Sequence, residues 1–343
     1  MPILTSELPL ARTLVVHACR DVLSRHEGMN GPCTTPEECA DWLEQMFEGY
    51  RRIWGPSTLR HWWKQRGELD TLNLWLLELA AVVSVDFVTM SDFRKEHGQP
   101  VFWHAENIEP AGKPIALVQA IFGQLCNYNR SMFIVAKKGL DLQLLALFRA
   151  HVELGQQALL LALDRSFFQA YLEWLDLADD ADRRERYDHW RSTMSPARVR
   201  ERLDAALRVT QLEPDTANEL SRYHRSTYAW LSEHHHGHPL ALLVRTFGAD
   251  GPKLGGRADS DTVEVLRKIT YFNFELFSLL ETAFGRIQGW TMDPSKEFCV
   301  EFMFKWRVLR SLSLQLMAAE EDAQRPDGRP EEDQGERDES GAG

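Results

Sequence analysis

The sequence predicts an all-α protein: a multi-helix bundle with a helical N-terminal region and a disordered acidic C-terminal tail. Leu, Phe and Trp recur along almost the whole chain with the 3.6-residue period of amphipathic helices. Period-two apolar runs bounded by turn residues, which indicate strands, are scarce. Because 44% of the 343 residues are apolar, the chain can build a substantial core.

The first expected helix covers residues 6–26. Leu10, Leu14 and Val22 recur there at helical spacing and share one side. The Gly, Asn and Pro residues of 28–36 then end the helix, because these residue types favour turns.

A second helix should begin at Thr35 and include Tyr50. Thr35 can cap its N-terminus, Pro36 suits the first helical position, and Glu37 and Glu38 lie near the positive end of the helix dipole. A short aromatic helix or turn is expected at 57–64, and a loop or small hairpin at 248–260. The remaining helices are expected at 69–88, 114–138, 141–164, 165–177, 182–193, 196–207, 214–234, 261–285 and 294–317.

Two segments suggest how the chain is divided. Residues 96–113 hold several Pro and Gly residues and predict a loop between an N-terminal helical region, 1–113, and a main bundle, 114–319. The tail, 320–343, contains ten acidic residues and three Arg, and no large apolar residue follows Met317. Such a segment cannot bury enough apolar surface to offset the entropy of ordering, so it should be disordered.

Charge and composition limit the classes of binding partner and the cellular compartment that we expect for this protein. The net charge is −12, of which the tail supplies −7 and the rest of the chain −5. This argues against strong nonspecific binding to duplex nucleic acid, although a local site for RNA or a nucleotide stays open. No secretory signal is evident, and the apolar stretch 154–163 is too short and too polar to cross a membrane. Five scattered cysteines predict free thiols in a cytoplasmic protein without a membrane partner.

The first candidate site motif is Arg149-x-x-x-Glu153 within an apolar run. Residues four apart lie on one face of a helix, so Arg149 and Glu153 can pair there. A guanidinium enclosed by apolar residues needs a carboxylate or an anionic ligand. The motif therefore predicts either a structural ion pair or an anion site oriented by Glu153.

The second motif is a ladder of four polar residues at four-residue spacing: His224, Tyr228, Ser232 and His236. Arg225 lies beside this stripe. Imidazole titrates near neutral pH, so His236 could transfer protons on a 2′-hydroxyl or phosphoester while His224 and Arg225 help to bind the ligand. The structural alternative is a helix end at which His residues meet the negative end of the dipole before Gly237.

Metal and cofactor sites are not predicted. The consecutive histidines of 234–236 point in different directions at a helix end, and no His-Glu-x-x-His or paired-Cys motif accompanies them. Gly-x-Ser-x-Gly and the glycine-rich loops that cradle phosphates are also absent from the sequence.

The order of motifs resembles that of a known group of proteins. Arg149-x-x-x-Glu153 is followed by Glu185-Arg186-Tyr187-x-x-Trp190 and by Tyr228-x-x-Leu231-Ser232-x-x-x-His236-Gly237. This order resembles a poorly characterised family of bacterial all-helical proteins, loosely similar to HEPN-type domains of toxin and phage-defence systems. The resemblance covers about residues 115–320. It implies a metal-independent ribonuclease with an antitoxin or complex subunit as protein partner.

Together, the motifs predict a polar site for a phosphate-containing ligand, with RNA or a nucleotide as candidates. In an enzyme, Arg149 would stabilise phosphorane charge, Glu153 and Tyr228 would orient the groups, and Ser232 and His236 would complete the site. The alternative is a noncatalytic interaction or regulatory protein in which the polar stripe is a structural network.

Overall fold

The computed structural model describes residues 8–25, 33–54, 66–97, 102–104, 112–164, 166–171, 173, 183–209, 214–235, 247–248, 251–252, 260–282, 290–292 and 297–324. Ten helices and four short strands are defined within these residues. In chain order they are α1 (Pro9–Arg25), α2 (Pro36–Trp54), α4 (Glu68–His97), β1 (Phe102–His104), α5 (Gly112–Lys137), α6 (Asp141–Leu163), α8 (Arg183–Thr193), α9 (Pro196–Val209), α10 (Pro214–His235), β2 (Phe247–Gly248), β3 (Gly251–Pro252), α12 (Ser260–Thr282), β4 (Trp290–Met292) and α13 (Glu297–Gln324). The all-α prediction is confirmed.

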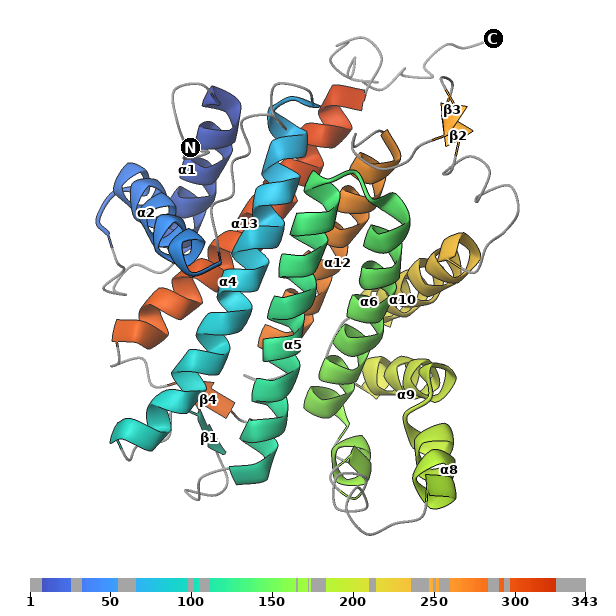
Figure 1. Cartoon of the computed structure of the whole chain (residues 1–343). Coiled ribbons are helices and arrows are strands. Elements are labelled where there is room, and N and C mark those ends of the chain that lie inside the picture. The colour runs from blue at the N-terminus through green and yellow to red at the C-terminus, as the bar shows by residue number, and fades with distance from the viewer. Residues whose placement is uncertain are drawn as a thin grey trace, which may run out of the picture.

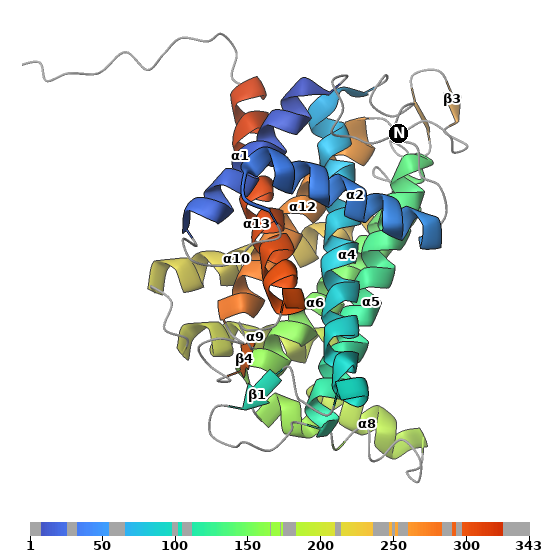
Figure 2. The same ribbon diagram turned by 90° about the vertical axis from the view of Figure 1, so that its left-hand side faces the viewer.

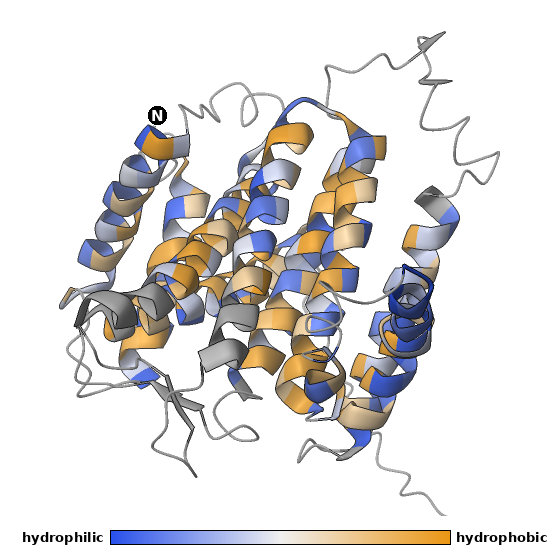
Figure 3. Cartoon of the chain, turned by 60° about the horizontal axis from the view of Figure 1, so that its bottom comes forward, coloured by the Kyte–Doolittle hydropathy of each residue, from blue (hydrophilic) through white to orange (hydrophobic). Residues whose placement is uncertain are grey.

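Helix α4 is the central helix of the bundle. Every residue from 71 to 84 is buried, as expected for a helix that is apolar on nearly all sides. It packs against α5, α12 and α13, while α6 packs against α5 and α12 (Figure 1). These five long helices hold most of the buried hydrophobic cluster, and Figure 3 shows hydrophobic residues along the packed helices of the bundle.

Shorter helices cover this core from two sides. Helix α1 lies against α13 and α2 lies against α1 (Figure 2). Away from them, α9 packs against α6 and α10, and α8 adjoins α9 (Figure 1). Helices α6, α9 and α10 therefore meet one another, which determines the geometry of the candidate site described below.

The start of α2 has the predicted capping arrangement. The hydroxyl of Thr35 accepts a hydrogen bond from the backbone N–H of Glu38 at 3.2 Å. The Glu38 carboxylate in turn accepts one from the backbone N–H of Thr35 at 3.1 Å. This reciprocal pair satisfies two N–H groups at the N-terminus of the helix.

The region expected to be a loop is shorter than predicted. Helix α4 extends to His97, and β1 pairs antiparallel with β4, with Trp103 opposite Thr291. Strands β2 and β3 form the small hairpin expected after residue 247. The helices on the two sides of the expected loop, α4 and α5, lie side by side (Figure 1). One cluster of buried apolar side chains includes Val15 near one end of the chain and Leu312 near the other.

The prediction that disorder begins at residue 320 was wrong for the first five residues. Helix α13 continues to Gln324, and Glu320 is buried. The Glu320 carboxylate accepts hydrogen bonds from Asn73 Nδ2 at 2.5 Å and from Arg267 Nε at 3.0 Å. Polar contacts to α4 and α12 hold this last turn, so the apolar pattern that ends at Met317 does not reveal it. Residues 325–343 lie outside the described residues, as does the expected turn at 57–64.

Within the described part of the chain, one segment is long and apolar enough to cross a membrane by length and composition alone. It is Glu68–Thr89 in α4, and 83% of its most apolar window is buried inside the bundle. Burial of this kind is found in the central helices of compact bundles.

Four of the cysteines are free thiols, as predicted: Cys19, Cys33, Cys39 and Cys126. Burial raises the pKa of Cys19 to about 12 and that of Cys126 to about 11. These two thiols therefore stay protonated at neutral pH and have little thiolate character.

Gly155 allows α6 and α12 to approach closely. A Cβ atom at this position would lie 2.9 Å from Phe272 Cζ and 3.1 Å from Leu276 Cδ2. We expect Gly155→Ala to destabilise the protein by up to about 2 kcal/mol, because an overpacking cost of about 1–3 kcal/mol opposes a gain of about 1 kcal/mol in helix propensity.

Gly123 is the matched control, since a Cβ atom there would lie an ordinary 3.8 Å from Val88 Cγ2. Gly123→Ala should stabilise the protein by about 0.5–1 kcal/mol. Urea unfolding of both variants measures the difference. Equal effects of the two substitutions would show that α6 and α12 do not need a glycine at their contact.

Candidate functional site

Three residues of the two predicted motifs meet where α6 contacts α10. Arg149 Nε donates to Glu153 Oε1 at 3.2 Å, which is the intrahelical pair that the spacing predicts. Arg149 Nη2 donates to the hydroxyl of Tyr228 at 2.8 Å, and that hydroxyl donates to Glu153 Oε1 at 3.2 Å. The three groups form a closed triangle of hydrogen bonds that joins the two helices.

A fourth residue, Arg200 of α9, adds a second guanidinium. Its Cζ lies 3.7 Å from the centroid of the Tyr228 ring, and the Cζ of Arg149 lies 5.1 Å from the same centroid. Both guanidiniums therefore lie within cation–π distance of the same phenol ring. The sequence analysis did not identify Arg200, because nothing in the pattern of α9 connects it with Tyr228.

Two guanidiniums and one carboxylate meet at this contact of α6, α9 and α10. Arg149 and Arg200 supply two positive charges, whereas Glu153 supplies one negative charge within the triangle. The Nη1 atom of Arg200 is buried, and it makes no hydrogen bond to any described residue. Buried donors of charged groups are normally bonded, so this atom requires a partner that the described chain does not provide.

The junction is open to solvent at its edge. The side chains of Arg149 and Glu153 keep 18% and 29% of their accessible surface. Electrostatic interactions at such partly covered positions are stronger than on an open surface, while a ligand can still enter from solution. We call Arg149, Glu153, Arg200 and Tyr228 the arginine junction.

Ser232 lies one turn beyond Tyr228 on α10. Its hydroxyl oxygen is buried and makes no hydrogen bond within the described part of the chain. Because Ser232 follows Tyr228 by four residues, it lies on the same face of α10, as the predicted stripe requires. It is therefore close to the arginine junction. His236, which would follow one turn later, lies outside the described residues.

His224, one turn before Tyr228, is buried at 2% exposure. Its ring packs edge-to-face against Phe272, with the two centroids 5.9 Å apart. Burial lowers the pKa of His224 to about 4, so its imidazole is neutral at physiological pH. This His224 lies in the core between α10 and α12, away from the surface at which a ligand would arrive.

Arg225 is engaged by a different group. Its Nε donates to Asp204 Oδ2 at 2.6 Å, its Nη2 also contacts that oxygen, and the hydroxyl of Ser221 donates to the other oxygen of the same carboxylate. The Arg225 side chain is 59% exposed. The structure thus places Arg225 in an ion pair with Asp204 between α9 and α10, and Asp204 is not a member of the arginine junction.

No group of three His, Cys, Asp or Glu side chains that could hold a metal ion occurs among the residues that the structure describes. His234 and His235 belong to the last turn of α10, and their side chains are outside that description.

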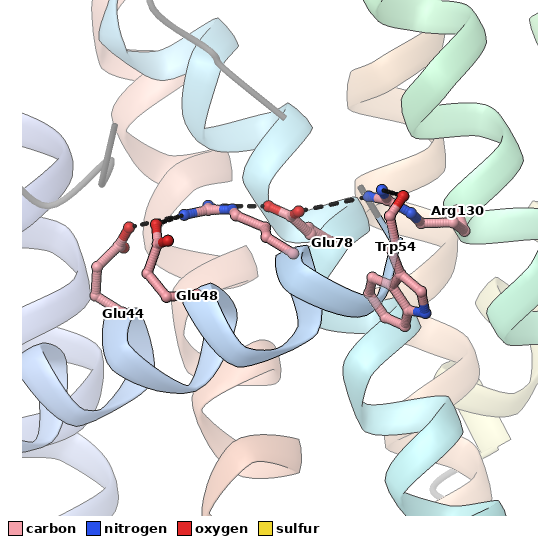
Figure 4. A network of polar contacts seen from close by, with 6 residues as sticks. Glu44, Glu48, Trp54, Glu78 and Arg130 are labelled. Atoms are coloured by element: carbon pink, nitrogen blue, oxygen red, sulfur yellow. Dashed lines mark hydrogen bonds and ion pairs between the residues drawn. The ribbon is translucent and has the colours of Figure 1, made fainter. Parts of the chain in front are cut away.

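A larger polar network, which sequence analysis missed, joins α2, α4 and α5 (Figure 4). The guanidinium of Arg51 contacts Glu44 at 3.2 Å, Glu48 at 3.0 Å and Glu78 at 3.1 Å. Glu78 is fully buried and also contacts Arg130 at 3.5 Å. Burial disfavours the charged form of Arg51, but Glu78 and Glu44 outweigh it and raise the pKa of the guanidinium.

The same network ends at an aromatic surface. Arg130 Nη2 donates to the carbonyl oxygen of Trp54 at 3.3 Å, and its Cζ lies 4.9 Å from the Trp54 ring centroid and 5.1 Å from that of Phe133. Each cation in this network has a carboxylate partner. We therefore interpret it as a structural network that fixes how α2 and α5 pack on α4.

A second buried chain of polar groups crosses the core. His151 Nε2 lies 2.8 Å from Asn273 Oδ1, and Asn273 Nδ2 donates to Asn129 Oδ1 at 2.9 Å. Asn129 Nδ2 bonds in turn to the carbonyl oxygen of Leu125 at 3.0 Å. This chain specifies the relative positions of α5, α6 and α12.

Comparisons with protein-family models, with curated proteins and with solved structures find no match for this chain.

Proposed function

We propose that this protein binds a phosphate-containing ligand at the arginine junction. One observation supports this most: two guanidiniums and one carboxylate surround Tyr228, and Arg200 Nη1 is a buried donor without a partner among the described residues. A phosphate would supply an acceptor for Arg200 Nη1 and would place negative charge beside the two guanidiniums. Arginine suits this role because its planar fork matches the oxygens of phosphate.

RNA is the ligand class that we propose first. The resemblance to HEPN-type proteins favours RNA, and the net charge of −12 makes strong binding by the general surface of the chain unfavourable. Binding would therefore depend on a local site such as the arginine junction. Glu153 and Tyr228 would hold Arg149 in a fixed orientation, which reduces the entropy lost when the ligand binds.

The test replaces Arg200, whose Nη1 has no hydrogen-bond partner among the described residues, and leaves the hydrogen-bonded triangle intact. Arg200→Gln should weaken binding of a single-stranded RNA oligonucleotide, measured by fluorescence anisotropy, by about tenfold or more, because a charge-assisted hydrogen bond contributes about 1.5–3 kcal/mol. ATP and inorganic phosphate, added as competitors, show whether a phosphate group alone is recognised. The slope of log K for RNA binding against log salt concentration should also become shallower by about one.

Arg198→Gln is the matched control. Arg198 lies two residues earlier on α9, is 56% exposed and pairs with Glu201 at 2.7 Å. The Arg198→Gln substitution also removes one positive charge, but outside the arginine junction. RNA binding should therefore change little. Equal loss of RNA binding in the two variants, or no binding of RNA, ATP or phosphate by the wild-type protein, would contradict the proposal.

The catalytic form of this proposal is a metal-independent ribonuclease. In it, His236 transfers a proton at the 2′-hydroxyl or leaving oxygen, and Arg149 stabilises the charge of the phosphorane. Expression of wild-type protein should then arrest growth and degrade total RNA. Arg149→Ala and His236→Ala should abolish both effects at unchanged melting temperature. An antitoxin or complex subunit would be its protein partner.

A noncatalytic interaction protein is the second candidate. It is favoured by the closed triangle, because Arg149 already bonds to Glu153 and Tyr228 within the protein. In that case Arg149→Ala would lower the melting temperature by several degrees, while RNA integrity in expressing cells would be the same for wild type and variant.

A further inference from the structure

A pocket of about 740 Å³ lies between α10 and α12, next to the end of α13. Its volume is in the range of sites that hold small organic ligands. We call it the α10–α12 pocket. Its lining residues are Tyr223, Ser226, Thr227, Trp230, Glu264, Arg267, Lys268, Tyr271, Met317, Glu320 and Glu321.

Helical spacing produces the two main walls. Tyr223, Thr227 and Trp230 recur at four and three residues along α10. Glu264, Lys268 and Tyr271 do the same along α12. Each set lies on one face of its helix, so aromatic rings and charged groups from the two helices face a common space.

The pocket differs from the arginine junction in position and in charge. Tyr228 faces α6, whereas Tyr223, Thr227 and Trp230 line the space toward α12. Three carboxylates line the pocket against the two cations Arg267 and Lys268. Arg267 is already bound by Glu320 at 3.0 Å and by Asp70 at 3.4 Å. The lining therefore has excess negative charge and disfavours a phosphate.

Lys268 shows which kind of group the aromatic wall accepts. Its ammonium nitrogen lies 4.7 Å from the ring centroid of Trp230 and 3.9 Å from the carboxylate of Glu264. The Tyr223 and Tyr271 rings extend the wall, edge-to-face with centroids 4.6 Å apart. Aromatic rings combined with carboxylates are the arrangement by which proteins recognise organic ammonium ions.

We propose that the α10–α12 pocket binds an organic ammonium ion, and that the ammonium group of Lys268 occupies part of this site when no ligand is present. The ligand ammonium would pack on Trp230 and pair with Glu264, and Lys268, which is 40% exposed, would move toward solvent. A free polyamine and a lysine side chain of a partner protein carry the same chemical group.

The experiment uses isothermal titration calorimetry on the full chain at constant ionic strength. Spermidine is the probe for a free amine, and a capped Gly-Lys-Gly peptide is the probe for a lysine side chain. A capped Gly-Gln-Gly peptide is the neutral control. We expect saturable binding of at least one amine probe and none of the neutral peptide, and the tighter amine identifies the source.

Substitution of Lys268 gives the sharpest result. Lys268→Gln removes the competing internal cation, so it should tighten amine binding by about three- to tenfold. Trp230→Leu, which keeps an apolar side chain but removes the aromatic face, should weaken it by about tenfold. Glu264→Gln, at an exposed carboxylate that puts folding at little risk, should weaken it by about threefold.

Two control variants change charge at exposed positions outside the pocket. Lys138→Gln should not reproduce the tighter binding of Lys268→Gln, and Glu201→Gln should not reproduce the loss expected for Glu264→Gln. The absence of saturable binding, weaker or unchanged binding in Lys268→Gln, or equal effects of the controls would each overturn the proposal. None of these results depends on whether RNA binds at the arginine junction.

Discussion

Replacement of Glu78 by Gln is expected to lower the free energy of unfolding by about 3–5 kcal/mol, the usual cost of removing one partner from a buried ion pair. Glu78 is fully buried and contacts both Arg51, which is 5% exposed, and Arg130. The neutral side chain would leave the guanidinium of Arg130 with the carbonyl oxygen of Trp54 and two aromatic rings, but without its carboxylate partner.

Glu48→Gln is the matched control for this prediction. Glu48 contacts the same guanidinium of Arg51 at 3.0 Å, but its side chain is 48% exposed. Its loss should cost less than about 1 kcal/mol, because solvent screens exposed pairs. Urea unfolding at pH 7 gives both values. Similar costs for the two substitutions would show that burial does not determine the strength of this network.

Acidification is expected to destabilise the protein through two buried histidines. Burial lowers the pKa values of His151 and His224 from the ordinary 6.5 to about 4 in the folded state. Below pH 6.5 the unfolded chain therefore binds protons that the folded protein does not. Stability is full above pH 6.5 and falls as the pH decreases toward 4. At pH 5 each histidine should cost about 2 kcal/mol relative to pH 7.

His224→Leu isolates one of these contributions. Neither ring nitrogen of His224 bonds to a described residue, so the substitution should cost less than about 1.5 kcal/mol at pH 7. When the pH falls from 7 to 5, the free energy of unfolding of the variant should decrease by about 2 kcal/mol less than that of wild type. Urea unfolding at both pH values measures this. If the variant loses as much stability as wild type between pH 7 and pH 5, His224 is not buried as a neutral imidazole.

His151→Leu provides a contrast. It removes the hydrogen-bond partner of Asn273 Oδ1 as well as the titrating group. We therefore expect a cost of about 1–3 kcal/mol at pH 7 for the acceptor left unpaired in the core, together with the same reduced dependence on pH as in His224→Leu.

Most helices could be predicted from the sequence because their signals are local. The Thr35 cap, the Pro residues at helix starts and the 3.6-residue apolar period depend only on residues a few positions apart. The Arg149–Glu153 pair was predictable for the same reason, since both residues belong to one helix.

Contacts between helices were harder to predict. The spacing of α10 brought Tyr228 into the candidate site, but it could not show that His224 faces Phe272 or that Arg225 pairs with Asp204. Arg200 reaches the site through the packing of α9 on α10, which leaves no local signal. Glu78 did offer one: it is the single carboxylate between residues 71 and 84, and a carboxylate within such an apolar stretch indicates a buried cationic partner.

The first and last of the described helices are neighbours in the bundle, since α1 packs against α13. Glu320 likewise bonds to Asn73, 247 residues earlier. Contacts between such distant segments cannot form while the later segment is still inside the ribosome. The surface of the central helix α4 that α13 covers must therefore stay exposed until α13 has left the ribosome, and this interval is when a chaperone would be of most use.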